Sequence, residues 1–335
     1  MNSLERIAST IAFKTTDRIP VIAQVFGHAA VQAGIPLNDY LRDGETIARC
    51  QLSALKRYGY DAVFSVMDVN VEAEALGSEV RYRENQYPTI ERYALSPDRG
   101  WALPPFPDPQ RAGRMPEMLA ALRILRRELG NEVLIVGCVL GPFTLVTQLI
   151  GLEKTIYLAI DDPECFERIL DFATDVVMSF GIEQLRSGAH LPVVFDPSAS
   201  PAVIPPQFFR EFELPRLTRL FKSLSGSGAI ANWLHIAGPV GPIIPLYPEA
   251  GVNIANFDYN VSATEMEKNC PTLCFDGNIK SLSFAEDSPE MIRQEALTLL
   301  RIFRQRGGFI LSSGCEIPPE SRPETIEALV NAVRL

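Results

Sequence analysis

Eight short apolar runs, each bounded by turn-forming residues, constrain the fold of this 335-residue chain more than any other feature. The runs are residues 19–25, 62–66, 133–139, 191–195, 229–235, 252–257, 272–275 and 308–312. Several are apolar throughout rather than alternating, which is typical of parallel strands covered on both faces. Helical patterns lie between most of them, and two open with a capping residue followed by proline, at Asp162-Pro163 and at Ser288-Pro289. The sequence therefore predicts a (β/α)8 barrel. A doubly wound sheet is the alternative, but no glycine-rich strand-to-helix turn favours it.

The segment between the second and third predicted strands is too long for a minimal barrel. Residues 79–95 alternate as a β-hairpin does, and residues 96–115 are a loop rich in Pro, Asp and Arg. We expect this insertion to cover part of the barrel mouth. No linker and no internal repeat interrupts the chain, so a single domain over residues 1–335 is predicted.

Composition excludes several classes of function. A net charge of −10 argues against nucleic acid as a partner, because binding phosphate backbones requires clustered Lys and Arg. No apolar run approaches the ~18 residues of a membrane span, and the first residues lack a signal-peptide pattern. The six cysteines are scattered, which favours a reducing cytoplasm over a disulfide framework.

Polar side chains follow the eight apolar runs, where a barrel enzyme carries its catalytic groups. They are Gln24, His28, Asp68, Cys138, Asp196, His235, Asp258, Asp276 and Cys315. Carboxylate, imidazole and thiol groups that converge on one mouth indicate a metal site or acid–base chemistry. For any single aspartate in this set, helix capping is the alternative role. His190 precedes a strand and is expected at the opposite, stabilising face, and Cys270 and Cys274 are expected to be ordinary buried cysteines.

Four stretches, in order along the chain, resemble the uroporphyrinogen decarboxylase superfamily. They are residues 58–63 leading to Asp68 and 72–77, then Gly141-Pro142-Phe143-Thr144-Leu145, then Asp196-Pro197-Ser198-Ala199-Ser200-Pro201, and finally Gly314-Cys315-Glu316-Ile317-Pro318-Pro319. Within the superfamily, the chain is most similar to the branch of methylcobamide:coenzyme M methyltransferases and related corrinoid-dependent methyltransferases. The resemblance covers essentially the whole chain and implies a (β/α)8 barrel.

The decarboxylases themselves resemble this chain less well. They carry an arginine-rich motif near the first strand, where residues 24–30 here contain no arginine. Gln148 stands where they have a tyrosine, and Cys315 stands where they have a histidine, whereas Asp68 matches their essential aspartate. A tetrapyrrole with many carboxylates needs cationic partners. A decarboxylase or other lyase and a non-catalytic binder of corrinoid or tetrapyrrole are therefore the two alternatives.

In the methyltransferase branch, the resemblance implies a zinc ion held by His-x-Cys and a distant cysteine, which activates a thiol. His235 and Cys315 match two of these ligands, but Ala237 occupies the position of the inner cysteine. Asp258 is the candidate replacement, because related zinc methyltransferases that act on homocysteine carry a carboxylate at that strand end. Glu316 is a second candidate. The alternative is that His235 is a hydrogen-bonded wall residue and Cys315 a small apolar filler.

The sequence thus predicts a cytoplasmic, corrinoid-dependent methyltransferase. A corrinoid protein is the expected partner, carrying methylcobalamin or a related corrinoid, and neither nucleic acid nor a membrane is expected to bind. The donor or acceptor would be a small molecule such as a thiol, an amine, a methoxy compound or a folate. Asp68 and Asp196 are the catalytic candidates, and His235, Asp258 and Cys315 are the candidate zinc ligands.

Overall fold

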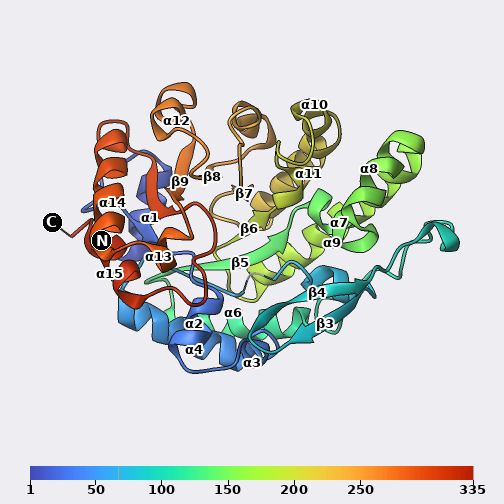
Figure 1. Ribbon diagram of the computed structural model, residues 1–335, viewed down its shortest axis with the longest axis horizontal. Helices are drawn as coiled ribbons and strands as arrows, with labels where there is room; N and C mark the ends of the chain where they lie inside the picture. The colour runs from blue at the N-terminus through green and yellow to red at the C-terminus, as the bar shows by residue number, and fades with distance from the viewer. Residues whose placement is uncertain (67, 335) are drawn as a thin grey trace.

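The structure, a computed structural model, describes residues 1–66 and 68–334. Eight parallel strands form one sheet with the order β1-β10-β9-β8-β7-β6-β5-β2, and helices surround it (Figure 1). The strands are β1 (Val21–Ile22), β2 (Ala62–Phe64), β5 (Leu134–Leu140), β6 (Leu191–Phe195), β7 (Trp233–His235), β8 (Ile254–Phe257), β9 (Cys274–Ile279) and β10 (Phe309–Ser313). Each of the eight predicted runs overlaps one of these strands, although β5, β9 and β10 extend beyond the predicted ends. The prediction of a (β/α)8 barrel is therefore confirmed.

One residue, Asp61, closes the barrel between its two edge strands, through its backbone N–H and its side chain, and no ladder joins those strands in the described residues. Among the described residues, β1 pairs with β10 alone, through Val21 opposite Leu311, and β2 pairs with β5 alone. Asp61, directly before β2, donates its backbone N–H to the carbonyl of Val21 and accepts the N–H of Val21 on Oδ2, both at 2.8 Å. Asp61 therefore bridges the seam between the first and second strands.

Helices fill the connections between strands and cover the outside of the barrel. They are α1 (Ser3–Ile11), α2 (Gly27–Gln32), α3 (Leu37–Tyr40), α4 (Gly44–Tyr58), α5 (Val71–Ala75), α6 (Met115–Leu129), α7 (Pro142–Ile150), α8 (Leu152–Asp161), α9 (Pro163–Arg186), α10 (Pro206–Phe208), α11 (Leu214–Gly226), α12 (Ala263–Asn269), α13 (Ser283–Glu286), α14 (Pro289–Phe303) and α15 (Pro323–Asn331). Short 3₁₀ segments are η1 (Pro97–Arg99), η2 (Pro197–Ala199) and η4 (Ile244–Ala250), and η3 (Phe209–Glu213) is a π-helix. Asp162 and Ser288 cap α9 and α14 as predicted.

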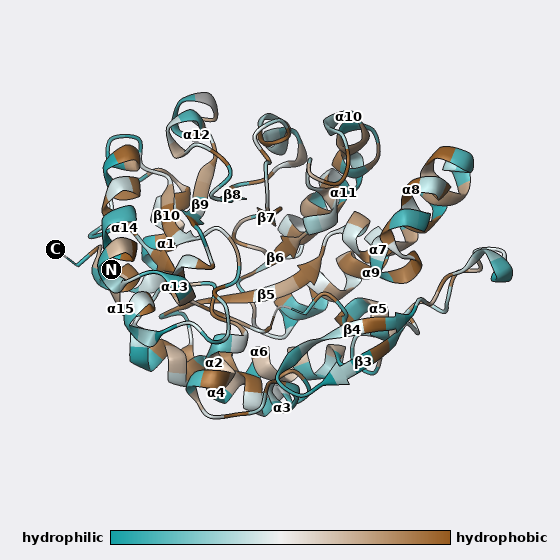
Figure 2. Cartoon of the chain, in the orientation of Figure 1, coloured by the Kyte–Doolittle hydropathy of each residue, from teal (hydrophilic) through white to brown (hydrophobic). Residues whose placement is uncertain are grey.

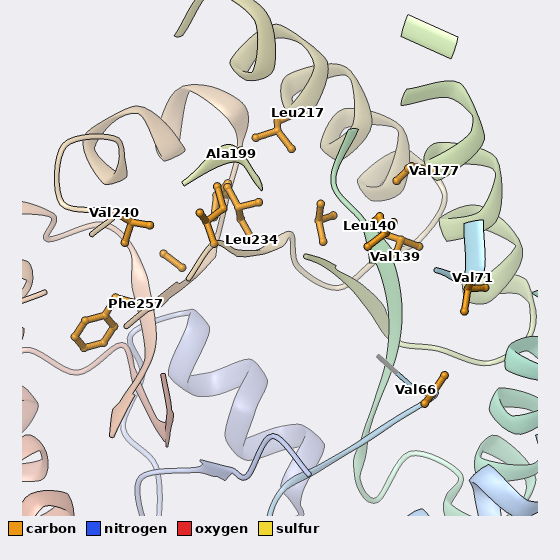
Figure 3. Close-up of a cluster of buried hydrophobic side chains, with 14 of the residues drawn as sticks. Val66, Val71, Val139, Leu140, Val177, Ala199, Leu217, Leu234, Val240 and Phe257 are labelled. Atoms are coloured by element: carbon orange, nitrogen blue, oxygen red, sulfur yellow. The ribbon is translucent and has the colours of Figure 1, made fainter. Parts of the chain in front are cut away.

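The core has two layers, one inside the barrel and one between the strands and the helices. The inner layer includes Phe64, Val136 and Trp233, and the outer layer includes Leu234. Figure 2 shows the strands as the most continuously hydrophobic part of the chain, and Figure 3 shows part of the outer layer, including Val139 and Val177. Because side chains alternate along a strand, His235 faces the same side as Trp233, toward the barrel interior.

The insertion between β2 and β5 forms the predicted hairpin, with strands β3 (Glu79–Arg83) and β4 (Gln86–Arg92) (Figure 1). The carbonyl of Pro88 accepts a hydrogen bond from Asn70 Nδ2 at 2.7 Å. The hydroxyl of Tyr87 donates to Glu316 Oε1 and accepts the N–H of Gly27 at 3.0 Å. The hairpin is thus fixed to three loops that follow β1, β2 and β10, which places it over the C-terminal end of the barrel as expected.

Within the described part of the chain, no single helix is both long enough and apolar enough to cross a membrane. In these residues, α7 and α8 taken together reach the length and hydrophobicity of a membrane span, but the two helices are bent by 105° relative to each other.

Candidate functional site

Asp68 lies on the loop that follows β2, where Asn70 and Arg114 contact its carboxylate. Oδ1 accepts from the backbone N–H and from Nδ2 of Asn70, at 3.0 and 2.8 Å, and Oδ2 lies 2.7 Å from Arg114 Nη1. The helix that follows, α5, receives no side-chain cap from Asp68; its first residue, Val71, donates to the backbone carbonyl of Asp68 instead. Asp68 lines a small cavity with Glu72 and other residues. The carboxylate is fixed in orientation at the mouth and is not used to cap the helix.

Arg114, the cation that faces Asp68, is itself shared between two acids. Its Nε donates to Glu74 Oε2 at 2.6 Å, and its Nη1 also donates to the carbonyl of Leu41 at 3.0 Å. Arg114 is buried, and burial lowers its pKa while the charges of Asp68 and Glu74 raise it, with a net increase. The guanidinium is thus shared between two carboxylates, while its Nη2 has no hydrogen-bond partner among the described residues.

His235 ends β7 and is buried inside the barrel. Its ring packs against the ring of Phe195, with 4.7 Å between centroids. Within residues 1–66 and 68–334, neither Nδ1 nor Nε2 finds a hydrogen-bond partner. Burial lowers the pKa of His235 to about 3, so the imidazole is neutral at physiological pH. A neutral ring with two free nitrogens can donate one hydrogen bond and accept another, or bind a metal.

Cys315 and Asp258 are neighbours on the loops that follow β10 and β8. A Cβ added to Gly314 would lie 2.6 Å from Asp258 Oδ1, so the glycine permits this close approach. Burial raises the pKa of the Cys315 thiol to about 11, and the charges of Glu316, Asp258 and Asp276 add to that effect. Cys315 is therefore a protonated thiol at neutral pH.

The three candidate zinc ligands do not form a metal-binding set in this arrangement. Asp258 already accepts the backbone N–H of Gly238 on Oδ2 at 2.9 Å and that of Tyr259 on Oδ1 at 2.7 Å. Among the described residues, no three His, Cys, Asp or Glu side chains are grouped so that they could hold a metal ion. His235 has free nitrogens, but the carboxylate that was expected to replace the missing cysteine at Ala237 serves the local backbone instead.

Asp196 follows β6, but its side chain turns away toward α7. Its Oδ1 accepts both the backbone N–H and the hydroxyl of Thr144, at 2.8 and 2.6 Å, and the residue is fully buried. A Cβ on Gly141 would lie 2.1 Å from the carboxyl carbon of Asp196, so only glycine fits there. The carboxyl of Glu213, on the π-helix η3, lies within hydrogen-bonding reach. Asp196 therefore joins β6 to the start of α7 and to η3.

Burial raises the pKa of both Asp196 and Glu213, and the charge of Asp196 raises that of Glu213 further. The two carboxyls share one proton, because two buried like charges in contact are costly. A pKa raised in the folded state contributes stability at low pH that is lost as pH rises through the folded pKa.

Glu213→Gln should therefore stabilise the protein at alkaline pH, since an amide donates to Asp196 without a titratable proton. We expect a gain of about 1–3 kcal/mol at pH 9 and a smaller one at pH 6, measured by urea unfolding. Glu211→Gln, an exposed carboxylate on the same π-helix, is the matched control and should change neither value. Equal free energies of unfolding for wild type and Glu213→Gln at both pH 6 and pH 9 would contradict a shared proton.

The sequence indicates Glu316 only as a second candidate metal ligand, but in the structure its carboxylate joins the hairpin to the loop after β1. Its Oε1 accepts from Tyr87 of the hairpin and from the N–H of Gly27, the latter at 3.2 Å. Burial raises the pKa of Glu316 to about 7. Pairing a hairpin tyrosine with a residue more than two hundred positions away leaves no local signal in the sequence.

The other two histidines and two of the remaining cysteines make contacts within the fold. His28 bonds the hydroxyl of Tyr58 at 2.8 Å and the carbonyl of Pro319 at 3.0 Å. Nδ1 of His190 accepts the N–H of Ile135 at 2.9 Å, near the N-terminal end of β5 as expected. Cys270 and Cys274 are free and buried, which confirms that reading.

Comparisons with known proteins cover the whole chain. Residues 2–335 match the family model described as "Uroporphyrinogen decarboxylase (URO-D)". A methylcobamide:CoM methyltransferase of Methanosarcina barkeri is 27% identical over 98% of this chain and 96% of its own length. A uroporphyrinogen decarboxylase of Aeromonas salmonicida is 25% identical over 87% of this chain and 83% of its own. A solved methyltransferase from Methanosarcina mazei superposes with a TM-score of 0.90, at 26% identity, over 99% and 98% of the two chains.

Proposed function

This chain belongs to the uroporphyrinogen decarboxylase (URO-D) family, and we propose that it is a methyltransferase that works with a corrinoid protein. The methyl group would move between the corrinoid protein and a small molecule: a thiol, an amine, a methoxy compound or a folate. The proposal treats residues 1–335 as one catalytic domain that acts in the cytoplasm. It is supported most directly by similarity over nearly full length to a methylcobamide:CoM methyltransferase and to a solved methyltransferase.

The distribution of charge at the mouth supports methyl transfer over decarboxylation of a polycarboxylate. The segment after β1, residues 24–30, holds no arginine, and the charge of Arg114 is already paired with Asp68 and Glu74. The carboxylates Asp258 and Glu316 lie close to Cys315 and would disfavour a substrate that carries many negative charges. A porphyrinogen with many carboxylates therefore finds few partners here, whereas a small molecule with few charges meets less repulsion.

We assign the roles as follows. Asp68, held by Asn70 and Arg114, binds and orients the small-molecule substrate. His235 lines the inner wall of the mouth and offers its free ring nitrogens to the bound molecule. The corrinoid protein is a substrate in this reaction: its methylated form would supply the methyl group, and in the reverse direction its reduced, unmethylated form would receive it. Asp196 is a positioning residue that acts through α7 and η3, without touching the substrate.

Zinc is given no step in this proposal, because no three candidate ligands are grouped to hold a metal ion among the described residues. Ala237→Cys should create one, since a soft thiolate two residues after His235 restores the third ligand that catalytic zinc requires. We expect the variant to retain about one zinc per chain after dialysis and wild type to retain less. Ala237→Ser, which adds a polar group without a thiol, is the matched control. Equal zinc retention by wild type and Ala237→Cys would show that the present residues already suffice.

Methyl transfer can be tested with methylcobalamin as the probe in place of the unidentified corrinoid protein. The purified chain is mixed with methylcobalamin and with 2-mercaptoethanesulfonate, homocysteine or tetrahydrofolate, and the methylated product is detected by mass spectrometry. The reverse direction uses reduced cobalamin with a methylamine or a methoxybenzoate. Product that depends on the chain supports the proposal. Decarboxylation of uroporphyrinogen without methyl transfer would favour the lyase, and tight binding of methylcobalamin without turnover would favour the non-catalytic binder.

A further inference from the structure

A second cleft lies at the opposite end of the barrel from the candidate site. It has a volume of about 680 Å³ and is lined by residues 13–19, which precede β1, and 303–309, which lead into β10. Both segments enter parallel strands, so the cleft is on the N-terminal face, beside α1 and α14 (Figure 1). A neighbouring hollow of about 380 Å³ shares Asp17, Arg18, Ile19 and Arg304 with it. Together they have the size of a small-molecule binding site.

The cleft is basic in a protein whose net charge is −10. Its linings contain the cations Lys14, Arg18, Arg301, Arg304 and Arg306, against one acid, Asp17. The carboxylate of Asp17 is already bound to Arg6, at 2.7 and 2.8 Å. A concentration of positive charge within one concave surface attracts anions from solution.

These cations fall into two groups, one built into the wall and one at the surface. Arg18 donates to both carboxylate oxygens of Asp61, at 2.7 and 2.9 Å, and Arg306 donates to the carbonyl of Cys270 at 2.7 Å. Lys14, Arg301 and Arg304 are exposed, and no ion pair is recorded for them within the described residues. The first group shapes the cleft and the second is available for a ligand.

The backbone at the cleft is held in an unusual conformation. Phe13 has a φ of 55°, in the left-handed region that non-glycine residues rarely adopt. Its ring lies beneath the guanidinium of Arg306, 5.3 Å from the ring centroid, and a Cβ on Gly308 would lie 2.3 Å from it. This conformation ends helix α1, because the N–H groups of Phe13 and Lys14 donate to the carbonyls of Thr10 and Ser9, as in a Schellman motif, and it directs the chain into the wall of the cleft.

From this geometry we propose that the N-terminal cleft binds a small phosphorylated molecule of about nucleotide size. Lys14 and Arg304 contact the phosphate, with the hydroxyls of Thr15 and Thr16 beside them. The adjoining hollow supplies an apolar wall from Leu297, Leu300 and Val333 for the rest of the ligand. Because the cleft is at the far end of the barrel, ligand binding there is independent of the methyl-transfer proposal.

The test is calorimetric titration of the purified full chain at low ionic strength with three probes: AMP, pyrophosphate and adenosine. AMP and pyrophosphate are expected to bind, and adenosine is not, since it lacks the phosphate. Binding by both anions points to phosphate recognition alone, and stronger binding by AMP shows that the apolar wall contributes. Added salt should weaken both, because exposed charges are screened.

The double variant Lys14→Ala/Arg304→Ala should weaken AMP binding roughly tenfold, from the loss of two exposed charge contacts. Arg304→Lys keeps the charge and should recover most of the affinity. Arg123→Ala, an exposed arginine on α6 with no recorded ion pair in the described chain, is the control and should bind as wild type does. Binding of adenosine as tight as that of AMP, no binding of either anion, or an unchanged affinity in the double variant would each overturn the proposal. Unchanged melting temperatures establish that the variants are folded.

Discussion

Asp61→Ala is expected to lower the free energy of unfolding by about 3–5 kcal/mol, the cost of breaking a buried ion pair from one side. Asp61 is fully buried and accepts from Arg6 Nη1 and Arg18 Nη1, each at 2.7 Å, and from Ser3 Oγ at 2.7 Å. Its removal leaves two guanidinium groups without their shared partner and also the N–H of Val21 without its acceptor. Urea unfolding followed by circular dichroism measures the loss.

Two control variants separate the effect of losing the buried charge from the effect of losing the contact that closes the barrel. Asp17→Ala removes the exposed carboxylate that also binds Arg6 and should cost less than about 1 kcal/mol. Asp61→Asn keeps an acceptor for Val21 but loses the charge, and should fall between the two. A loss for Asp61→Ala no larger than for Asp17→Ala would mean that the seam between β1 and β2 is held by other contacts.

Asp68→Asn is expected to reduce kcat/KM for methyl transfer by about 100-fold, the scale of loss when a substrate is misplaced in an active site. The substitution preserves the size of the side chain but removes the negative charge that faces Arg114 at 2.7 Å. The variant should therefore disturb the orientation of the substrate more than the stability of the fold. The measurement is steady-state kinetics with methylcobalamin and the acceptor that wild type uses.

Glu74→Gln is the matched control, because Glu74 is the other carboxylate bound to Arg114 and is more exposed than Asp68. It should alter stability slightly and leave kcat/KM within a few-fold of wild type. If Asp68→Asn keeps full activity while its melting temperature falls, Asp68 stabilises the loop and does not orient the substrate.

Patterns close together in the sequence predicted most of the fold. Continuous apolar runs located all eight strands, and Asp162 and Ser288 with the prolines after them located the starts of α9 and α14. Alternation around Asn85 located the hairpin. Each of these signals acts over a few residues, because strand burial, capping and turn formation are local.

Side-chain direction was harder to predict, because it depends on contacts between distant residues. Asp196 follows its strand as expected, yet its carboxylate meets Thr144 and Glu213. The carboxylate oxygens of Asp258 accept the N–H groups of Gly238 and of Tyr259, the next residue in the chain. Position after a strand indicates which end of the barrel a residue occupies, but not whether its side chain faces the mouth, the next loop or the surrounding helices.

The pairing of β1 has a consequence for how the chain is made. Among the described residues, β1 forms a ladder with β10 alone. Val21 therefore lies opposite Leu311, which is almost the whole length of the chain away in sequence. During synthesis, the first strand emerges long before its partner, and it stays without a ladder until the last part of the barrel has left the ribosome. Contacts between such distant segments form slowly, because a long loop must close first. A nascent chain halted before residue 309 should therefore bind chaperones at its N-terminal segment, and release should coincide with the appearance of β10.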